Sequence, residues 1–306
     1  MSAIAAKSQR TSLAKMRTRR ERWGWFFTAP FTIVFTLFLL APLGYSFYMS
    51  LYKKGMVGGA RFAGAQNYVR AFTDPIFLHG LLRVLLFVVV MVPIQIVLAS
   101  LVAMVLDVLT TKLARVSRLL VFLPYAVPAM IGALMWSFLY SPSFGPIKQL
   151  FSAMGLSAPN VLSPNNVFGA LVNVVTWQWV GYYMIIIFAA LKAVDPSLYE
   201  AALIDGASSF QTAVRIKLPL IAPSLVMCTV FSLIGTLQFY TEPVTLRAAA
   251  PSAIPVTYTP NMYAQNLAFS QGLFNYSATI SFSLGIIVFI GSYAFLFATR
   301  KQSGLK

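Results

Sequence analysis

The stretch Glu200-Ala201-Ala202-Leu203-Ile204-Asp205-Gly206, followed ten residues later by Ile216-Lys217-Leu218-Pro219, decides how this chain is interpreted. It is a charged segment between two long apolar runs. Asp195 and Pro196 just before it predict the start of a helix, because aspartate caps helix N-termini and proline suits the first helical position. Gly206 predicts the end of that helix, since glycine readily adopts the left-handed conformation that closes many helices.

This charged segment predicts two short helices joined at an angle. We expect the first to run over 198–204 and the second over 208–216, stopping before Pro219, where the next apolar run begins. Joined at Gly206, they would form a compact projection, named here the coupling segment (195–219). Such a projection can dock in a cleft of a partner and carry rigid-body motion into the apolar runs on either side.

The side chains of the coupling segment fit a docking role. Ala201 and Ala202 allow a partner surface to approach closely, and Glu200 offers a fixed anion to a basic or amide-bearing groove. Arg215 and Lys217 are expected to face lipid headgroups. The alternative is an amphipathic loop that lies at the membrane interface without any partner.

The composition indicates a membrane protein. Of the 306 residues 58% are hydrophobic and only 10% are charged, and the mean hydropathy is +0.76, whereas roughly a quarter of a soluble domain is charged. The net charge of +16 does not indicate nucleic-acid binding, because the basic residues lie between apolar runs. Cys228 and His79 are the only cysteine and histidine, so no disulfide and no metal site is expected. No nucleotide-binding glycine motif is present.

About 20 apolar residues are needed for a helix to cross the hydrocarbon core. Six runs meet this requirement, at about 24–50, 81–106, 117–140, 167–191, 219–243 and 276–299. The sequence therefore predicts an all-α membrane protein with six transmembrane helices, in which the coupling segment forms a cytoplasmic helix-turn-helix between the fourth and fifth spans. Residues 1–22 would be a basic cytoplasmic tail and residues 23–306 a single transmembrane domain, with a kink at Pro93 in the second span.

The distribution of basic residues predicts the orientation of these spans. With the N-terminus in the cytoplasm, most of the 23 lysines and arginines lie inside, including the basic residues of the coupling segment. Both termini are then cytoplasmic. The coupling segment is cytoplasmic as well, as a docking role on an intracellular partner requires.

The full pattern of Glu-Ala-Ala, Asp-Gly-Ala and Leu-Pro-Leu resembles the cytoplasmic coupling motif of ATP-binding-cassette importer permeases. The resemblance runs from about Trp25 to Arg300 and is to permeases of the maltose and glycerol-3-phosphate importer type. It includes Phe62-Ala63-Gly64, Asn67-Tyr68, Asp74-Pro75, Phe122-Leu123-Pro124-Tyr125, Pro128, Trp136, Phe144-Gly145 and Gly235-Thr236-Leu237-Gln238-Phe239. One departure is Ala248-Ala249-Ala250, where many relatives carry glycines, so this loop is expected to be stiffer.

The resemblance implies that this chain is a permease subunit of the bacterial inner membrane and not an enzyme. It implies four kinds of partner besides lipid: a second permease subunit, two ATPase subunits, an extracytoplasmic substrate-binding protein and the transported sugar, polyol or glycerol phosphate. ATP and magnesium would bind to the ATPases, so no cofactor is expected here. The residues implied in ATPase coupling are Glu200, Ala201, Ala202, Asp205, Gly206, Leu218 and Pro219.

The resemblance also implies substrate contacts from the spans on either side of the coupling segment. By position these are Trp177, Gly181, Tyr182, Thr236, Gln238, Tyr240 and Glu242. Amides and hydroxyls can hydrogen-bond to sugar hydroxyls, and aromatic faces can pack against a sugar ring. The alternatives are an aromatic belt at the membrane interface and polar contacts between helices. Glu242 could meet a cationic group of the substrate or lie in headgroup water.

Two other classes of protein compete with this interpretation. An ion-coupled secondary transporter should carry charged residues in mid-membrane and often inverted repeats, yet none of the seven acidic residues falls clearly in mid-span. An intramembrane enzyme would need a cluster of catalytic groups, which the sequence does not contain.

Overall fold

The computed structural model describes residues 23–54, 59–108 and 112–299. The basic tail predicted at 1–22 lies outside these ranges. Within them, four single helices are long and apolar enough to cross a membrane: Trp23–Ser50, α4 (Pro75–Val108), α8 (Val167–Lys192) and α15 (Phe274–Ala298). Two bent helix pairs raise the number to six if each pair is one span. The described residues therefore contain the predicted six spans if each bent pair is counted as one span.

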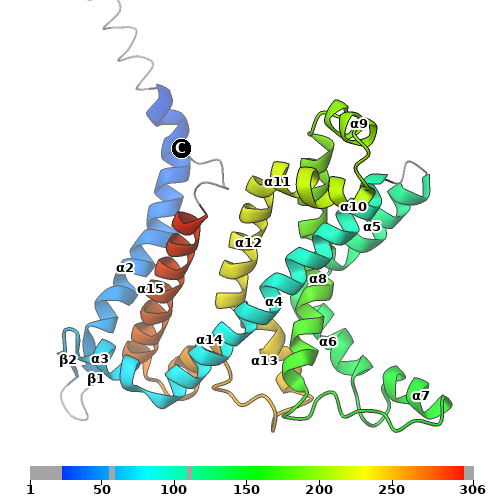
Figure 1. Ribbon diagram of the computed structural model, residues 1–306. Helices are drawn as coiled ribbons and strands as arrows, with labels where there is room; N and C mark the ends of the chain where they lie inside the picture. The colour runs from blue at the N-terminus through cyan, green and yellow to red at the C-terminus, as the bar shows by residue number, and fades with distance from the viewer. Residues whose placement is uncertain (1–22, 55–58, 109–111, 300–306) are drawn as a thin grey trace, which may run out of the picture.

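The first helix and the last helix pack together at one side of the molecule (Figure 1). The first contains a π-helical stretch, η1 (Thr36–Leu40), and ends as α2 (Ala41–Ser50). It leads into an antiparallel hairpin, β1 (Tyr52–Lys54) and β2 (Ala60–Phe62), and then into α3 (Gln66–Thr73). The amide of Asn275 in α15 donates to the carbonyl of Met49 at 2.8 Å, which fixes α15 to the end of α2.

The centre of the molecule is the contact between α4 and α8 (Figure 1). Phe87 and Met91 of α4 and Leu171 of α8 are fully buried in one apolar cluster. Farther along, Ala99 and Ala103 lie in a second cluster with Met184. Small residues at such positions allow two helices to approach closely where no hydrophobic effect drives them together.

The third predicted span is not one straight helix. The run at 117–140 forms α5 (Lys112–Ala126) and α6 (Ala129–Leu139), which are bent by 98°. Pro128 causes the break, because its backbone is extended and it has no N–H to continue the helix. The carbonyl of Val127 at the break accepts a hydrogen bond from the Gln178 amide of α8 at 3.0 Å. A buried polar side chain thus satisfies a carbonyl that has no helical donor because the helix breaks here. The short helix α7 (Pro146–Ala153) follows.

The fifth predicted span, 219–243, is shorter than expected. Helix α12 covers only Ala222–Leu237, and the chain leaves the helix before α13 (Thr241–Arg247), because Tyr240 has a non-helical backbone (φ −148°, ψ −53°). The rest of the chain forms α14 (Pro260–Gln265), the π-helical η3 (Asn266–Ser270) and α15.

The two ends of the molecule differ (Figure 1). One end carries the coupling segment, and the first described helix begins and α15 finishes at this same end. The opposite end carries the hairpin, α3 and α7.

Candidate functional site: a coupling segment and a buried chamber

The first helix of the coupling segment forms as the sequence predicts. Helix α9 covers Ser197–Ile204, and the Asp195 carboxylate accepts the Ser197 N–H at 2.9 Å. Gly206 has φ +78°, and the Ala207 N–H donates back to the Ala202 carbonyl at 3.0 Å. This hydrogen bond across a left-handed glycine is the Schellman ending of a helix. The glycine turn is confirmed. The helix starts one residue later than the predicted cap implies, because Pro196 and not Asp195 is the N-cap residue.

The second helix is longer than predicted. It begins as α10 (Ser209–Thr212), where Ser208 and Gln211 form a reciprocal capping box. It continues through the π-helical η2 (Ala213–Lys217) into α11 (Leu218–Leu220), and then bends by 72° into α12. The prediction that it stops before Pro219 is wrong. The wider π-helical turn just before Pro219 accommodates a residue that lacks an N–H.

The surface of the coupling segment combines charge with exposed apolar side chains. Of the seven residues assigned to ATPase coupling, Ala202 is buried and Leu218 is half-buried, while Glu200, Ala201, Asp205, Gly206 and Pro219 are exposed. Next to them Ile204 is 86% exposed and Phe210 is 76% exposed. Phe210 was not singled out from the sequence. Exposed apolar groups beside a carboxylate form a surface suited to a protein partner.

A buried carboxylate attaches the coupling segment to the helices below it. Asp107, at the end of α4, has a side chain only 7% exposed and lies between two lysines. Lys192 at the end of α8 lies 2.7 Å from one carboxylate oxygen, and Lys217 of η2 lies 2.5 Å from the other. The Lys217 ammonium also lies 4.8 Å from the ring centre of Tyr199 in α9. Sequence reasoning missed this cluster, because its members lie far apart along the chain.

A chamber of about 240 Å³ lies where α4, α8, α12 and α13 meet. Four of the seven residues predicted to contact substrate line it: Thr236, Gln238, Tyr240 and Glu242. The other polar and aromatic residues on the wall are Gln95, Trp179, Tyr183, Ser232, Phe239 and Thr241. The signal for Gln95 was present in the sequence, as an amide inside an apolar run needs a partner.

Hydrogen bonds order part of this wall. The Ser232 hydroxyl lies 2.6 Å from the Gln95 side-chain oxygen, and the Thr236 hydroxyl donates to the Ser232 carbonyl at 2.8 Å. Glu242 is different. It is 93% buried, with 7% exposure, and no other described residue forms an ion pair or side-chain hydrogen bond with its carboxylate. It therefore lies on a chamber wall and not at an exposed end of a span.

The other three predicted substrate residues lie outside this wall. Trp177 packs edge to face against Trp136 of α6. Gly181 faces α5, where a Cβ atom would lie 2.0 Å from the Val121 carbonyl oxygen. Tyr182 stacks on Tyr125 with a centroid distance of 4.6 Å. These contacts favour helix packing for Gly181, and a role in substrate contact stays a prediction for all three.

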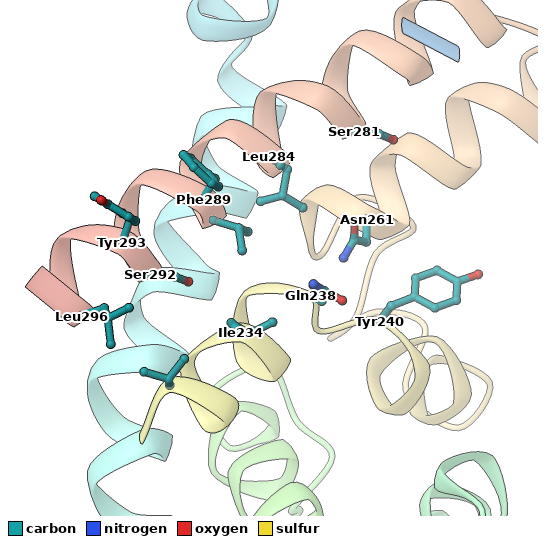
Figure 2. Close-up of a pocket in the computed structure, with 13 residues that line it drawn as sticks. Ile234, Gln238, Tyr240, Asn261, Ser281, Leu284, Phe289, Ser292, Tyr293 and Leu296 are labelled. Atoms are coloured by element: carbon teal, nitrogen blue, oxygen red, sulfur yellow. The ribbon is translucent and has the colours of Figure 1, made fainter. Parts of the chain in front are cut away.

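A second, more open groove of about 820 Å³ lies between α12 and α15. Figure 2 shows Gln238 and Asn261 reaching toward one another at one end of this groove. The α15 side is mostly apolar, with Leu284, Phe289, Tyr293 and Leu296. Gln238 and Tyr240 line both cavities, so the groove and the chamber adjoin one another.

Comparison with known proteins decides the family. The sequence model of the binding-protein-dependent transport system inner membrane component matches residues 55–301. The chain belongs to this family. Members are inner membrane components, which agrees with the apolar helices and with the predicted membrane location. The family is defined by dependence on a binding protein, and nothing in the comparisons supports an ion-coupled transporter or an intramembrane enzyme.

Relatives of this family member are permease proteins. This chain is 31% identical to the lactose transport system permease protein LacF of Rhizobium radiobacter, over 95% of this chain and 99% of that protein. It is 30% identical to the trehalose/maltose transport system permease protein MalF of Thermococcus litoralis, over 74% and 77% of the two chains. A chain of a bacterial ABC transporter that imports the acidic polysaccharide alginate has a TM-score of 0.81, with 21% identity and coverage of 94% and 98%. That likeness shows the fold.

Proposed function

We propose that this chain is one of two permease subunits of an ATP-driven importer for a sugar, an oligosaccharide or a related polyol or glycerol phosphate. The family membership and the sugar permeases among the relatives support this function. The observation that carries the mechanism is the exposed coupling segment, which is joined through Asp107 to the ends of α4 and α8.

In this mechanism the energy comes from outside the chain. Two partner ATPases bind ATP and magnesium, and each grips one coupling segment. Here Ile204 and Phe210 would enter a cleft of the ATPase, and Glu200 would meet a basic or amide-bearing group at its rim. Because the segment is bonded to α4 and α8, its displacement moves both helices and changes access to the chamber between them.

The remaining partners follow from the two ends of the molecule. The coupling segment and both ends of the described chain lie together (Figure 1), which supports cytoplasmic termini. The binding protein would deliver substrate at the opposite end, and the second permease subunit would cover the apolar groove along α15. Substrate would pass through the chamber lined by Thr236, Gln238, Tyr240 and Glu242.

Substitutions that add positive charge and bulk to the coupling segment test its role in coupling. Glu200→Lys and Gly206→Arg, introduced together in the assembled importer, should abolish substrate-stimulated ATP hydrolysis and weaken retention of the ATPase subunits. Gly155→Arg is a matched control, because Gly155 also has a positive φ, of +69°, and has open space around it, but it follows α7 at the other end. The control complex should keep its ATPase subunits. Unchanged stimulation in the double variant would remove this proposal.

A further inference from the structure

One ionisable side chain distinguishes the chamber wall. The residues that line the chamber include a single acid, Glu242, and no lysine, arginine or histidine. The other polar groups on the wall are amides, hydroxyls and the indole of Trp179. The chamber wall therefore carries one carboxyl group and no basic side chain.

A buried carboxylate is costly unless donors reach it. Two threonine hydroxyls near Glu242 along the chain donate to backbone carbonyls: Thr236 to Ser232 and Thr245 to Thr241. The carboxylate is thus left with acceptor capacity directed at whatever enters the chamber. Sugar hydroxyls are donors of suitable size, and a carboxylate can accept two of them at once.

We propose that Glu242 selects the charge of the transported sugar. The chamber takes an uncharged saccharide, whose hydroxyl groups donate to Glu242, and it rejects sugars that carry a carboxylate, phosphate or sulfonate. Two like charges in a confined space of low dielectric repel strongly. This inference rests on the proposed transport function and narrows its substrate class. Family membership alone does not decide it, because the matched proteins include importers of neutral disaccharides and of an acidic polysaccharide.

The first experiment measures the charge that a small molecule meets in the chamber. Gly235 lines the chamber, and a Cβ atom there would meet no atom within 4 Å. Gly235→Cys is introduced into the assembled importer after Cys228 and the cysteines of the partners are replaced. Its rate of reaction is then measured with a cationic and with an anionic methanethiosulfonate. Gly169→Cys on α8 is the control, because Gly169 is exposed and has open space around it but does not line the chamber.

The Glu242 charge should favour the cationic reagent at Gly235→Cys, relative to a free thiol. Adding Glu242→Gln should lower the cation-to-anion ratio of rates by about tenfold, as expected for a unit charge a few ångströms away. The ratio at Gly169→Cys should not change. A ratio at Gly235→Cys that Glu242→Gln leaves unaltered would overturn the proposal, because the carboxylate would then be neutral or paired with a partner's cation.

The second experiment tests the sugar class with a matched pair of probes. Lactitol and lactobionate are open-chain disaccharide derivatives, and lactitol carries a hydroxymethyl group where lactobionate carries a carboxylate. Lactitol should protect Gly235→Cys from the neutral reagent methyl methanethiosulfonate, and lactobionate should not. Adding Glu242→Gln should reduce the difference in protection between the two sugars. Equal protection in the unsubstituted chamber, or protection by neither sugar at saturating concentration, would overturn the inference. The ATPase-coupling test stands apart, since it depends on Glu200 and Gly206 and not on Glu242.

Discussion

The carboxylate of Asp107 lies 2.5 Å from the ammonium of Lys217, although 110 residues separate them in the sequence. One of these residues ends α4, and the other lies in the middle of the coupling segment. The second oxygen of the same carboxylate binds Lys192 at the end of α8. A single side chain therefore connects the two central helices to the projection that a partner ATPase would grip.

Removing the charge of Asp107 should loosen this connection. The Lys217 side chain is only 12% exposed, and Asp107→Asn leaves its ammonium without a carboxylate partner. Removal of one partner from a buried ion pair costs about 3 kcal/mol of stability. We expect a lower melting temperature of the purified complex and fewer molecules transported per ATP hydrolysed. Lys192→Gln is the milder comparison, because the Lys192 side chain is 52% exposed and an exposed ion pair contributes about 1 kcal/mol or less.

Charge exchange separates this mechanism from simple destabilisation. Asp107→Lys combined with Lys217→Asp restores an opposite-charge pair between α4 and η2. The double variant should recover part of the coupling that Asp107→Lys alone loses. Equal transport per ATP in Asp107→Asn and in the unsubstituted chain would argue that this ion pair does not transmit motion.

A second prediction concerns the close contact of α8 with α5. A side chain at Gly181 would meet the Val121 carbonyl oxygen and the Phe122 Cα atom, both of which belong to the backbone. Backbone cannot move aside as a flexible side chain can, so Gly181→Ala should cost about 2–3 kcal/mol of stability. Gly169→Ala in the same helix meets nothing within 4 Å and should be neutral or slightly stabilising. Thermal unfolding of the two variants, measured side by side, tests the difference.

Local signals in the sequence were sufficient for the features that depend on neighbouring residues. The end of α9 at Gly206 follows from capping chemistry within one turn and is found, and the Asp195 carboxylate accepts the first N–H of the helix, although Pro196 is the N-cap residue. The apolar runs likewise predict where helices lie, because lipid requires long apolar segments. The break at Pro128 was visible as a proline, but its 98° bend depends on Gln178 of another helix, which satisfies the freed carbonyl.

Features that depend on distant residues could not be read from the sequence. Asp107 looked like an ordinary acid at the end of a span, and only folding brings two lysines to it. Glu242 looked like a residue at the outer end of the fifth span, but the helix ends at Leu237 and α13 turns the side chain into the chamber wall. The candidates on α12 and beyond line the chamber, whereas Gly181 faces α5, and substrate contact stays a prediction for all of them.

A third prediction tests order within the coupling segment. Ser208 accepts the Gln211 N–H at 3.3 Å, and Gln211 accepts the Ser208 N–H at 2.8 Å. Ser208→Ala removes the first of these bonds and should cost about 1 kcal/mol. Faster amide hydrogen exchange in residues 208–212, with retained transport, would be the expected result. Ser209→Ala is the control within the same helix, and an equal effect of the two substitutions would contradict a role for the cap.

The last prediction concerns pH at the opposite end of the molecule. Asp74, just before α4, accepts hydrogen bonds from the hydroxyls of Tyr263 and Tyr276, each at 2.8 Å. Burial acts to raise the pKa of Asp74, but these hydrogen bonds and those from backbone N–H groups outweigh it, and the pKa lies below the ordinary aspartate value. The unfolded chain therefore binds the proton more tightly than the folded chain does. The resulting stabilisation is complete above the ordinary aspartate pKa and disappears as the pH falls through the lower, folded value.

Because the pKa of Asp74 is lowered by folding, the melting temperatures of the unsubstituted importer and its Asp74 variants should differ in how they depend on pH. The unsubstituted importer should lose stability as the pH falls below the ordinary aspartate pKa, and Asp74→Asn should lose less, because it has no proton to bind there. Tyr263→Phe combined with Tyr276→Phe should also flatten the profile, since the two hydroxyls that favour the charged carboxylate are gone. If Asp74→Asn and the unsubstituted chain show parallel profiles, other carboxylates cause the acid sensitivity, and the hydrogen bonds to Asp74 fix α4 to α14 and α15 without any linkage to pH.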